Sequence, residues 1–295
     1  MLTSETILLD GGLATELEAR GHDLSDALWS ARLLADAPEE IVAAHAAFFA
    51  AGADVATTAS YQASFAGFAA RGIDPRTSAE LLRRSVTLAK EARDGTEQAG
   101  RRRWVAASVG PYGATLADGS EYRGRYGLSQ RELKAFHLPR MEVLAEAEPD
   151  LLALETVPDI EEATALVDAL DSVGLPAWLS YTVEGGRTRA GQSLAEAFAV
   201  VADRDAVIAV GVNCCDPADV APAVAMARAI TGKPVVAYPN SGEDWDADGR
   251  SWRGSPRFRA AELAAHATGG PAFLGGCCRV SPRDIAILAQ HIHLT

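Results

Sequence analysis

The sequence predicts one (β/α)8 barrel domain, a TIM barrel of class α/β spanning residues 1–295. Three observations lead to this fold class. Short apolar stretches alternate with amphipathic stretches about eight times along the chain. Most of these short stretches are apolar throughout, as parallel strands covered on both faces are. The 295 residues also suit a barrel, which typically needs about 250. An open doubly wound sheet is the competing fold, but no G-x-G-x-x-G motif follows the first predicted strand.

The predicted strands and helices alternate in a fixed order. The strands are Thr6–Leu9, Asp54–Thr58, Trp104–Val109, Leu151–Glu155, Ala177–Tyr181, Val207–Val212, Val235–Tyr238 and Ala272–Leu274. The helices are Pro38–Ala51, Ser78–Ala92, Ser129–Ala147, Ile160–Ser172, Ser193–Ala202, Ala218–Ile230, Arg257–Ala267 and Pro282–His291. No linker rich in proline, glycine or serine interrupts this alternation, so a single domain is expected.

Capping signals mark several helix ends. Asp36 and Ser281 each stand just before a proline and further acidic residues, which predicts that they are N-caps. Three glycines follow helical patterns at positions where a left-handed closing residue is favoured: Gly52, Gly174 and Gly232.

The charge of the chain limits its partners. A net charge of -13 disfavours binding to nucleic acids and to anionic membranes, because these surfaces repel an acidic protein. Residues Met1–Thr15 lack the basic and apolar regions of a signal peptide, and the apolar stretch Ile41–Ala51 is too short to span a bilayer. A cytoplasmic location with reduced thiols is therefore expected. The oligomeric state stays open.

The unusual residues of the sequence follow the predicted strands. Barrel enzymes place their active sites at the C-terminal ends of the strands. The segments found there are Asp10–Gly12, Thr57–Tyr61, Gly110–Gly127, Glu155–Thr156, Asn213–Cys215, Pro239–Gly254 and Gly275–Cys278. An active site built from these segments is expected. The histidines fall on helices, loops or the C-terminal tail and are weak candidates.

Four cysteines form two adjacent pairs, Cys214–Cys215 and Cys277–Cys278. In a reducing compartment this pattern favours metal binding or catalysis over disulfides. Consecutive strand residues point to opposite faces, so the second pair could bind one ion only if the chain turns there. The preceding glycines, Gly275 and Gly276, would allow such a turn. Strand six lies two strands away, which lets Cys214 reach the same mouth, whereas Cys215 is expected to be a bystander.

Three thiolates would leave the fourth tetrahedral position of a zinc ion open to a substrate thiol, as catalytic zinc sites require. Buried free cysteines are also common as small apolar residues. The cysteine pattern alone therefore leaves three readings open, namely a zinc site, core packing and redox chemistry.

Ordered motifs extend from Leu8 to the last helix. They include Asp10–Glu18, Gly52–Val55, Thr57–Ser64, Ser108–Gly113, Leu116–Tyr122, Glu155–Thr156, Gly211–Cys215, Tyr238–Glu243 and Gly275–Arg279. With them the chain resembles the homocysteine S-methyltransferase family, which includes betaine–homocysteine methyltransferase and the homocysteine domain of cobalamin-dependent methionine synthase. The resemblance implies a Zn²⁺ ion held by Cys214, Cys277 and Cys278. It also implies methyl transfer from a sulfonium donor to the thiol of L-homocysteine, which yields methionine.

The resemblance also suggests substrate contacts. It implies backbone contacts from Gly11 and Gly12 to homocysteine, binding of the substrate ammonium by Glu155, and a supporting role for Asp10. Asn213 would position the metal loop. A cationic donor calls for aromatic faces, and the candidates are Trp29, Tyr61 and Tyr112, followed by Trp245 and Trp252.

The expected donor is S-methylmethionine, with S-adenosylmethionine second, because the chain length and the motif Tyr238–Trp245 resemble the S-methylmethionine branch. Cobalamin is not expected, since no second domain is present to carry it. Two alternatives stay open: methylation of selenocysteine or selenohomocysteine, and a non-catalytic zinc or redox protein built on a barrel.

Overall fold

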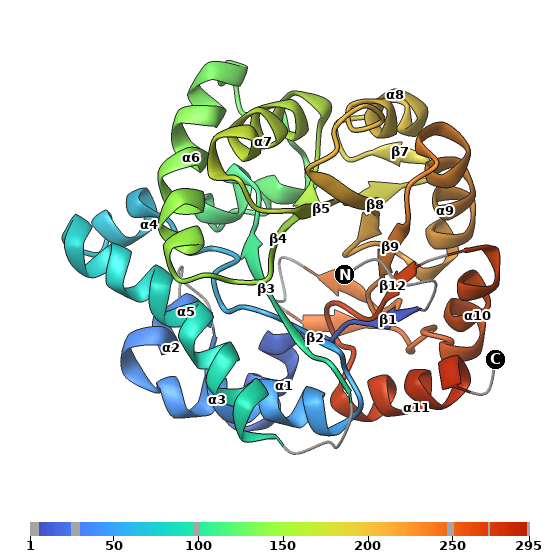
Figure 1. Cartoon of the computed structure of the whole chain (residues 1–295), viewed down its shortest axis with the longest axis horizontal. Coiled ribbons are helices and arrows are strands. Elements are labelled where there is room, and N and C mark those ends of the chain that lie inside the picture. The colour runs from blue at the N-terminus through green and yellow to red at the C-terminus, as the bar shows by residue number, and fades with distance from the viewer. Residues whose placement is uncertain (1–5, 25–29, 97–100, 247–250, 271, 294–295) are drawn as a thin grey trace.

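The computed structural model describes residues 6–24, 30–96, 101–246, 251–270 and 272–293. Eight parallel strands form one sheet in the order β1-β12-β9-β8-β5-β4-β3-β2. A parallel bridge between Leu9 and Val55 joins the two edge strands, supported by a 2.7 Å bond from the Asp54 amide to the Leu8 carbonyl. The strands are β1 (Ile7–Leu8), β2 (Val55–Thr57), β3 (Trp104–Val109), β4 (Leu151–Val157), β5 (Ala177–Tyr181), β8 (Val207–Asn213), β9 (Val235–Tyr238) and β12 (Ala272–Leu274). The predicted (β/α)8 barrel is confirmed (Figure 1).

Helices surround the strands on the outside of the barrel (Figure 1). They are α1 (Leu13–Ala19), α2 (Ser30–Asp36), α3 (Pro38–Ala50), α4 (Phe65–Ala69), α5 (Pro75–Gly95), α6 (Gln130–Glu146), α7 (Ile160–Val173), α8 (Leu194–Ala199), α9 (Pro217–Thr231), α10 (Ala260–Ala264) and α11 (Pro282–His293). Within the described residues, every helix is too short or too polar to span a bilayer.

Two apolar layers stabilise the barrel. The outer layer lies between strands and helices, and the inner layer fills the barrel with side chains from successive strands. The inner layer includes Ile7, Leu9, Val55, Trp104, Leu151, Trp178, Val236, Tyr238 and Phe273. Because both faces of the strands are buried, the strands contain few polar residues, and those few are informative about the site.

Helix caps explain where the predicted boundaries were wrong. Helix α5 starts at Pro75, three residues early, because the Asp74 carboxylate accepts bonds from the amides of Arg76 and Thr77. The prediction that Asp36 caps the next helix was also wrong. Asp36 is the last residue of α2, and Ala37 is the N-cap of α3 without a side-chain bond. A fully helical Asp36 cannot adopt the extended backbone that an N-cap requires.

The other capping predictions are confirmed. The Ser281 hydroxyl and amide both contact the Asp284 carboxylate, at 2.7 and 2.9 Å, at the start of α11. The three glycines predicted to end helices, Gly52, Gly174 and Gly232, all have positive φ.

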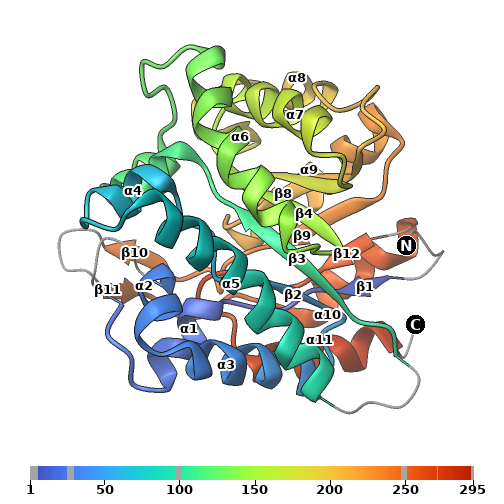
Figure 2. The same cartoon turned by 60° about the vertical axis from the view of Figure 1, so that its left-hand side comes forward.

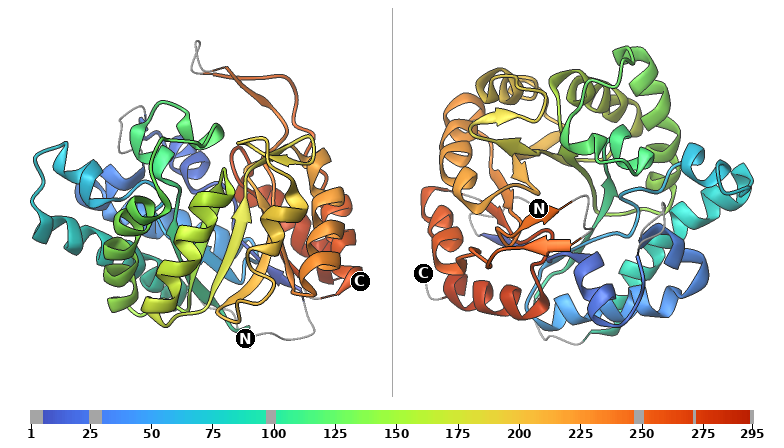
Figure 3. Two further views of the ribbon diagram at one scale, coloured as in Figure 1. Left: turned by 90° about the horizontal axis from the view of Figure 1, so that it is seen from above. Right: turned by 180° about the vertical axis from the view of Figure 1, so that it is seen from behind.

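The loops contain elements that the sequence did not indicate. These are α1, α2, α4, the hairpin of β6 (Val183–Glu184) with β7 (Arg187–Thr188), and the hairpin of β10 (Asp244–Asp246) with β11 (Ser251–Arg253). Among the described residues, 3-10 helices also occur at η1 (Tyr112–Leu116) and η2 (Ser120–Tyr122), and η3 (Ala265–Gly269) continues α10 where a single helix over Arg257–Ala267 was predicted. The β10–β11 hairpin lies outside the barrel and projects beyond the helices (Figures 2 and 3).

Candidate active site

Three cysteine side chains meet at the C-terminal end of the barrel. Cys214 directly follows β8, and Cys277 and Cys278 lie in the loop after β12. Their sulfur atoms all lie within 4.8 Å of one another, with 3.7 Å between Cys214 and Cys278 and 4.0 Å between Cys277 and Cys278. Cys215 does not join them; it is buried in the outer apolar layer.

Backbone hydrogen bonds hold this cluster in place. The Cys277 amide donates to the Pro239 carbonyl at 2.8 Å, and the Cys278 amide donates to the Asn240 side-chain oxygen at 3.1 Å. Cys214 itself has a φ of 50°, in the left-handed region that non-glycine residues rarely adopt. The loop after β9 therefore positions the cysteines that follow β12.

Gly275 and Gly276 serve a different purpose from the one predicted. Neither has a φ in the left-handed region, so they do not provide a turn. They provide space instead. A Cβ at Gly275 would lie 2.6 Å from the Leu9 Cβ, and one at Gly276 would lie 2.1 Å from a Val280 methyl carbon. The turn itself falls at Arg279, which has a φ of 66°.

Gly276→Ala is expected to weaken metal binding at least tenfold, because the added methyl group must displace the segment that carries Cys277 and Cys278. Titration of the metal-free protein with Zn²⁺ against a chromophoric chelator measures this loss. Gly95→Ala is the matched control, since an added Cβ there meets no atom within 4 Å. Equal zinc affinity in the Gly276 variant would show that the loop tolerates the displacement.

The cysteine cluster fits a tetrahedral metal ion. Two sulfur ligands at about 2.3 Å from a tetrahedral zinc lie roughly 3.8 Å apart. The spacings of 3.7 and 4.0 Å agree with this value. Bonds from Cys277 and Cys278 hold the pKa of Cys214 well below its ordinary value, and the contacts with Cys214 raise the pKa of both donors. A bound cation would favour deprotonation of all three thiols, because cysteines bind metals as thiolates.

Glu155 lies at the end of β4 in a network of hydroxyl groups. Its carboxylate accepts bonds from the Ser108 hydroxyl and, at 3.0 Å, from the Tyr238 hydroxyl. The Tyr238 oxygen in turn accepts a 3.0 Å bond from the Trp178 indole and lies 2.8 Å from the Ser180 hydroxyl. Burial raises the pKa of Glu155 to about 7, although the bonds from Ser108 and Tyr238 lower it.

Thr156, the next residue, has a strained backbone. Its φ of 59° is an outlier for a β-branched residue. The Asn213 side chain clamps it, with its oxygen accepting from the Thr156 amide and its nitrogen donating to the Thr156 hydroxyl, both at 2.8 Å. Asn213 is buried and directly precedes Cys214. This clamp therefore couples the end of β4, which carries Glu155, to the loop of Cys214.

Asp10 follows β1 and accepts bonds from the amide and hydroxyl of Thr57, at 2.7 and 3.0 Å. Burial raises the pKa of Asp10 to about 8, and the nearby charge of Glu155 adds to the rise. Within the described residues, neither carboxyl forms an ion pair with an arginine or lysine. A positively charged ligand at this end of the barrel would favour the ionised forms of both acids, because an opposite charge stabilises a buried carboxylate.

Gly11 and Gly12 pack against the cysteine loop. A Cβ at Gly12 would lie 2.6 Å from the Cys277 carbonyl, and one at Gly11 would lie 2.5 Å from the Val280 carbonyl. The Gly12 amide donates to the same Val280 carbonyl at 2.9 Å. These glycines allow the loop after β1 to approach the cysteine loop closely.

The predicted aromatic residues differ in their placement. Tyr61 packs against Gly110, and its hydroxyl bonds to Thr156 beside the cysteines. Tyr112 instead packs against Phe136 and Tyr126, with ring centroids 4.9 and 5.2 Å away. Trp29 lies outside the described residues, as do the side chains of Trp245 and Trp252.

Several polar residues of the site were not predicted from the sequence to have a role. They are Ser108, Tyr122, Ser180, Tyr238 and Asn240. The two serines could have been identified from the sequence, because a hydroxyl inside an otherwise apolar, fully buried strand needs a hydrogen-bond partner. The two tyrosines lie in motifs that carried the family resemblance. Asn240 lies two residues after the end of β9, in one of the loops at the C-terminal end of the barrel where a site was expected.

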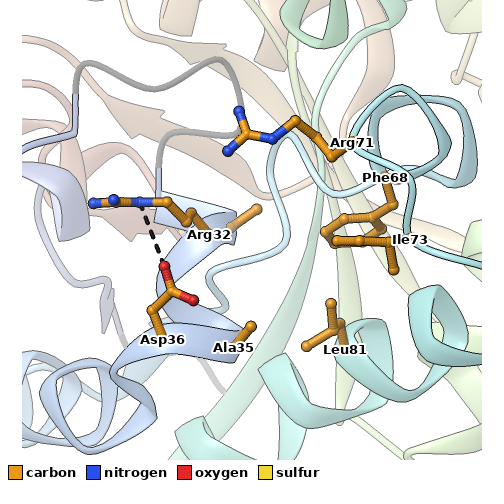
Figure 4. A pocket seen from close by; sticks show the side chains of 8 residues that line it. Arg32, Ala35, Asp36, Phe68, Arg71, Ile73 and Leu81 are labelled. Carbon is orange, nitrogen blue, oxygen red and sulfur yellow. Dashed lines mark ion pairs between the residues drawn. The ribbon is translucent and has the colours of Figure 1, made fainter.

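A separate pocket lies at the barrel periphery between α2, α4 and α5 (Figure 4). It has a volume of about 230 Å³ and shares no residue with the cysteine cluster. Arg32 and Asp36, 3.9 Å apart, line one side, and Phe68, Ile73 and Leu81 line the other. No cysteine or histidine lines it, so the chemistry described above belongs elsewhere.

Comparisons with known proteins point in one direction. A family model described as homocysteine S-methyltransferase matches residues 7–292. The chain is 45% identical over 294 residues to the homocysteine S-methyltransferase of Escherichia coli (strain K12), covering 96% of this chain and 94% of the relative. It is 41% identical over 298 residues to the homocysteine S-methyltransferase YbgG of Bacillus subtilis (strain 168), covering 97% and 94%. The metallated form of the homocysteine methyltransferase MmuM from Escherichia coli superposes with a TM-score of 0.87 at 42% identity, covering 97% and 96%.

Proposed function

The chain belongs to the homocysteine S-methyltransferase family, and on that premise we propose that it transfers a methyl group from S-methylmethionine to the thiol of L-homocysteine, with a zinc ion as its metal cofactor. Transfer to homocysteine follows from the family; the donor, the zinc ion and the residue roles are the proposal. The whole chain, residues 1–295, is proposed to act as one homocysteine-binding barrel domain. The observation that carries the proposal is the convergence of three cysteine sulfurs at a spacing suited to one tetrahedral ion.

Cys214, Cys277 and Cys278 are proposed to hold the metal. When bound, Zn²⁺ supplies the Lewis acidity that keeps a coordinated thiol deprotonated at neutral pH. A relative with 42% identity has been solved in a metallated form, which supports metal binding as such, and the three clustered sulfurs indicate where the metal would bind in this chain. Thiolate ligands favour zinc over hard cations such as Mg²⁺.

The surrounding residues are proposed to bind the amino acid part of homocysteine. Glu155 offers a buried carboxylate for the substrate ammonium. The loop at Gly11 and Gly12 is proposed to contact the substrate carboxylate through its backbone, although the Gly12 amide already donates to the Val280 carbonyl at 2.9 Å. Asp10 holds this loop against β2 through Thr57. Asn213 is proposed to fix the position of Glu155 relative to Cys214, because it bonds to Thr156, next to Glu155, and directly precedes Cys214.

In the proposed reaction, the homocysteine sulfur forms a bond to the methyl carbon while the bond from that carbon to the donor sulfur breaks. A thiolate and a sulfonium become two neutral thioethers, so the donor needs no proton and the site needs no general acid. Alignment of the two sulfur atoms supplies much of the acceleration. Tyr61, beside the cysteines, is proposed to face the cationic donor.

The donor can be read from the stoichiometry of the products. S-methylmethionine should yield two methionines for each homocysteine consumed, and S-adenosylmethionine should yield one methionine and one S-adenosylhomocysteine. We expect turnover with the first donor in an assay of the zinc-loaded protein, with betaine as a third donor and selenohomocysteine as a competing acceptor. Absence of methionine with all three donors would contradict the proposed function. Preferred use of S-adenosylmethionine would correct the donor alone.

A further inference from the structure

Tyr122 contacts one of the three clustered cysteines directly. It ends the 3-10 helix η2 in the long loop after β3, and its hydroxyl oxygen lies 3.1 Å from the sulfur of Cys214. A phenol hydroxyl can donate a hydrogen bond, whereas a metal-bound thiolate can only accept one. In the metal-bound protein the tyrosine must therefore be the donor of this hydrogen bond.

The Tyr122 ring is fixed from its other side by Arg189. The guanidinium carbon lies 5.7 Å from the ring centroid, and the Arg189 Nε donates to the Tyr122 carbonyl at 3.0 Å. A 3.3 Å ion pair with Glu184 holds Arg189 in turn. Contacts at the ring and at the backbone thus hold Tyr122, which leaves its hydroxyl little freedom to turn away from Cys214.

Residues in the segment after β5 contact both Tyr122 and Cys214. Besides Arg189, it contains Thr182, whose hydroxyl donates to the Cys214 carbonyl at 3.1 Å. The loop that carries Tyr122 is anchored at its start, where the Glu162 carboxylate accepts a 2.6 Å bond from the Tyr112 amide. Several elements therefore fix the distance between the Tyr122 hydroxyl and the Cys214 sulfur.

The sulfur contacts of Cys214 differ from those of the other two cysteines. The backbone amides of all three are bonded: Cys214 donates to the Tyr238 carbonyl, Cys277 to the Pro239 carbonyl and Cys278 to the Asn240 side chain. Among the hydrogen bonds of the described residues, the sulfur of Cys214 is the one that contacts a hydroxyl group. A hydrogen bond to a coordinated thiolate withdraws electron density from it, so it tunes the metal as well as orienting the ligand.

We propose that Tyr122 is a positioning residue of the metal centre, donating a hydrogen bond to the Cys214 thiolate that strengthens metal retention and reduces the charge this ligand donates. The inference rests on the proposed metal site. Reduced donation from Cys214 leaves the ion more electrophilic toward the thiol of homocysteine. Groups that orient a ligand in this way typically contribute about 10- to 100-fold in metal affinity or activity.

Tyr122→Phe tests the inference because it removes only the hydroxyl group. In the full-length protein loaded with Co²⁺, the sulfur-to-cobalt charge-transfer absorption is expected to move to lower energy, since the Cys214 thiolate becomes more electron-rich. Competition with a chelator is expected to show zinc affinity about 10- to 100-fold weaker. Arg189→Leu keeps the Tyr122 hydroxyl but removes the guanidinium that contacts the ring. It should shift the cobalt absorption and the zinc affinity in the same directions, but by smaller amounts.

Tyr181→Phe is the matched control. Its hydroxyl donates to the Ala197 carbonyl at 2.8 Å, on the helix side of the barrel, so its loss should leave the cobalt spectrum unchanged. A Tyr122 variant with the zinc affinity and cobalt spectrum of the unmodified protein would overturn the inference while leaving the metal site intact. An unmodified protein that binds neither ion would overturn the metal site and, with it, this role of Tyr122.

Discussion

Cys277→Ala is expected to reduce methionine formation and zinc affinity by more than about 100-fold each. This exceeds the loss typical for a group that merely orients a ligand, because the substitution removes a direct bond to the metal. Two sulfurs would remain in the cluster, Cys214 and Cys278, at 3.7 Å. Two thiolates leave two positions open to water, so the substrate thiol would no longer complete a closed site. Metal content after dialysis, followed by the methyl-transfer assay, measures both losses.

Cys215→Ala provides the control, because Cys215 neighbours Cys214 in sequence but lies outside the cluster. Its side chain packs in the outer apolar layer, and burial raises the pKa of its thiol. The substitution should cost about 1 kcal/mol of stability, typical of a single change, and leave zinc content unaltered. Equal loss of metal in both variants would show that the cysteines affect zinc through folding and not as ligands.

The barrel and the meeting of the three cysteines were accessible from the sequence for one physical reason. In a parallel barrel, all strands end at the same face. Once β8 and β12 are recognised from their apolar stretches, Cys214 and Cys277 must lie near each other whatever the loops do. The residue type favours a soft metal if one binds there, whereas the choice of zinc came from the family resemblance.

The contacts and backbone conformations that position the cysteines could not be predicted in this way. Gly275 and Gly276 were expected to supply a turn, but their role depends on the position of Leu9 and Val280, which are distant in sequence. The φ of 59° at Thr156 runs against the preference of a β-branched residue, and a clamp from Asn213 maintains it. No local pattern predicts a conformation that tertiary contacts impose.

The wrong helix starts and the loop contacts that were not predicted have a related cause. Asp36 is a residue type that is common at N-caps, but α2 extends through it, so Asp36 has the backbone conformation of the preceding helix. The contact between Tyr122 and Cys214 joins residues 92 positions apart through a loop without apolar periodicity. Such contacts follow from loop geometry, which composition and periodicity do not determine.

Glu155→Gln is expected to lower kcat/KM for homocysteine by about 10- to 150-fold, because a hydrogen bond to a charged group contributes about 1.5–3 kcal/mol. The glutamine keeps the size of the side chain and can still accept from Ser108 or Tyr238. The loss should therefore appear in homocysteine binding, while zinc content stays constant. Glu161→Gln, an equivalent change at an exposed position on α7, should leave kcat/KM unaltered.

The pH dependence of this loss separates the charge of Glu155 from its shape. Burial raises the pKa of Glu155 to about 7, so the free protein holds a neutral carboxyl below pH 7 and a carboxylate above it. Binding of an ammonium requires the carboxylate. The ratio of kcat/KM between the unmodified protein and Glu155→Gln should thus rise about tenfold per pH unit below 7 and level off above it. Taking the ratio cancels the titration of the homocysteine thiol, which both proteins share. A ratio that stays constant from pH 5.5 to 8.5 would mean that Glu155 acts without its charge, and the ammonium would then need another partner.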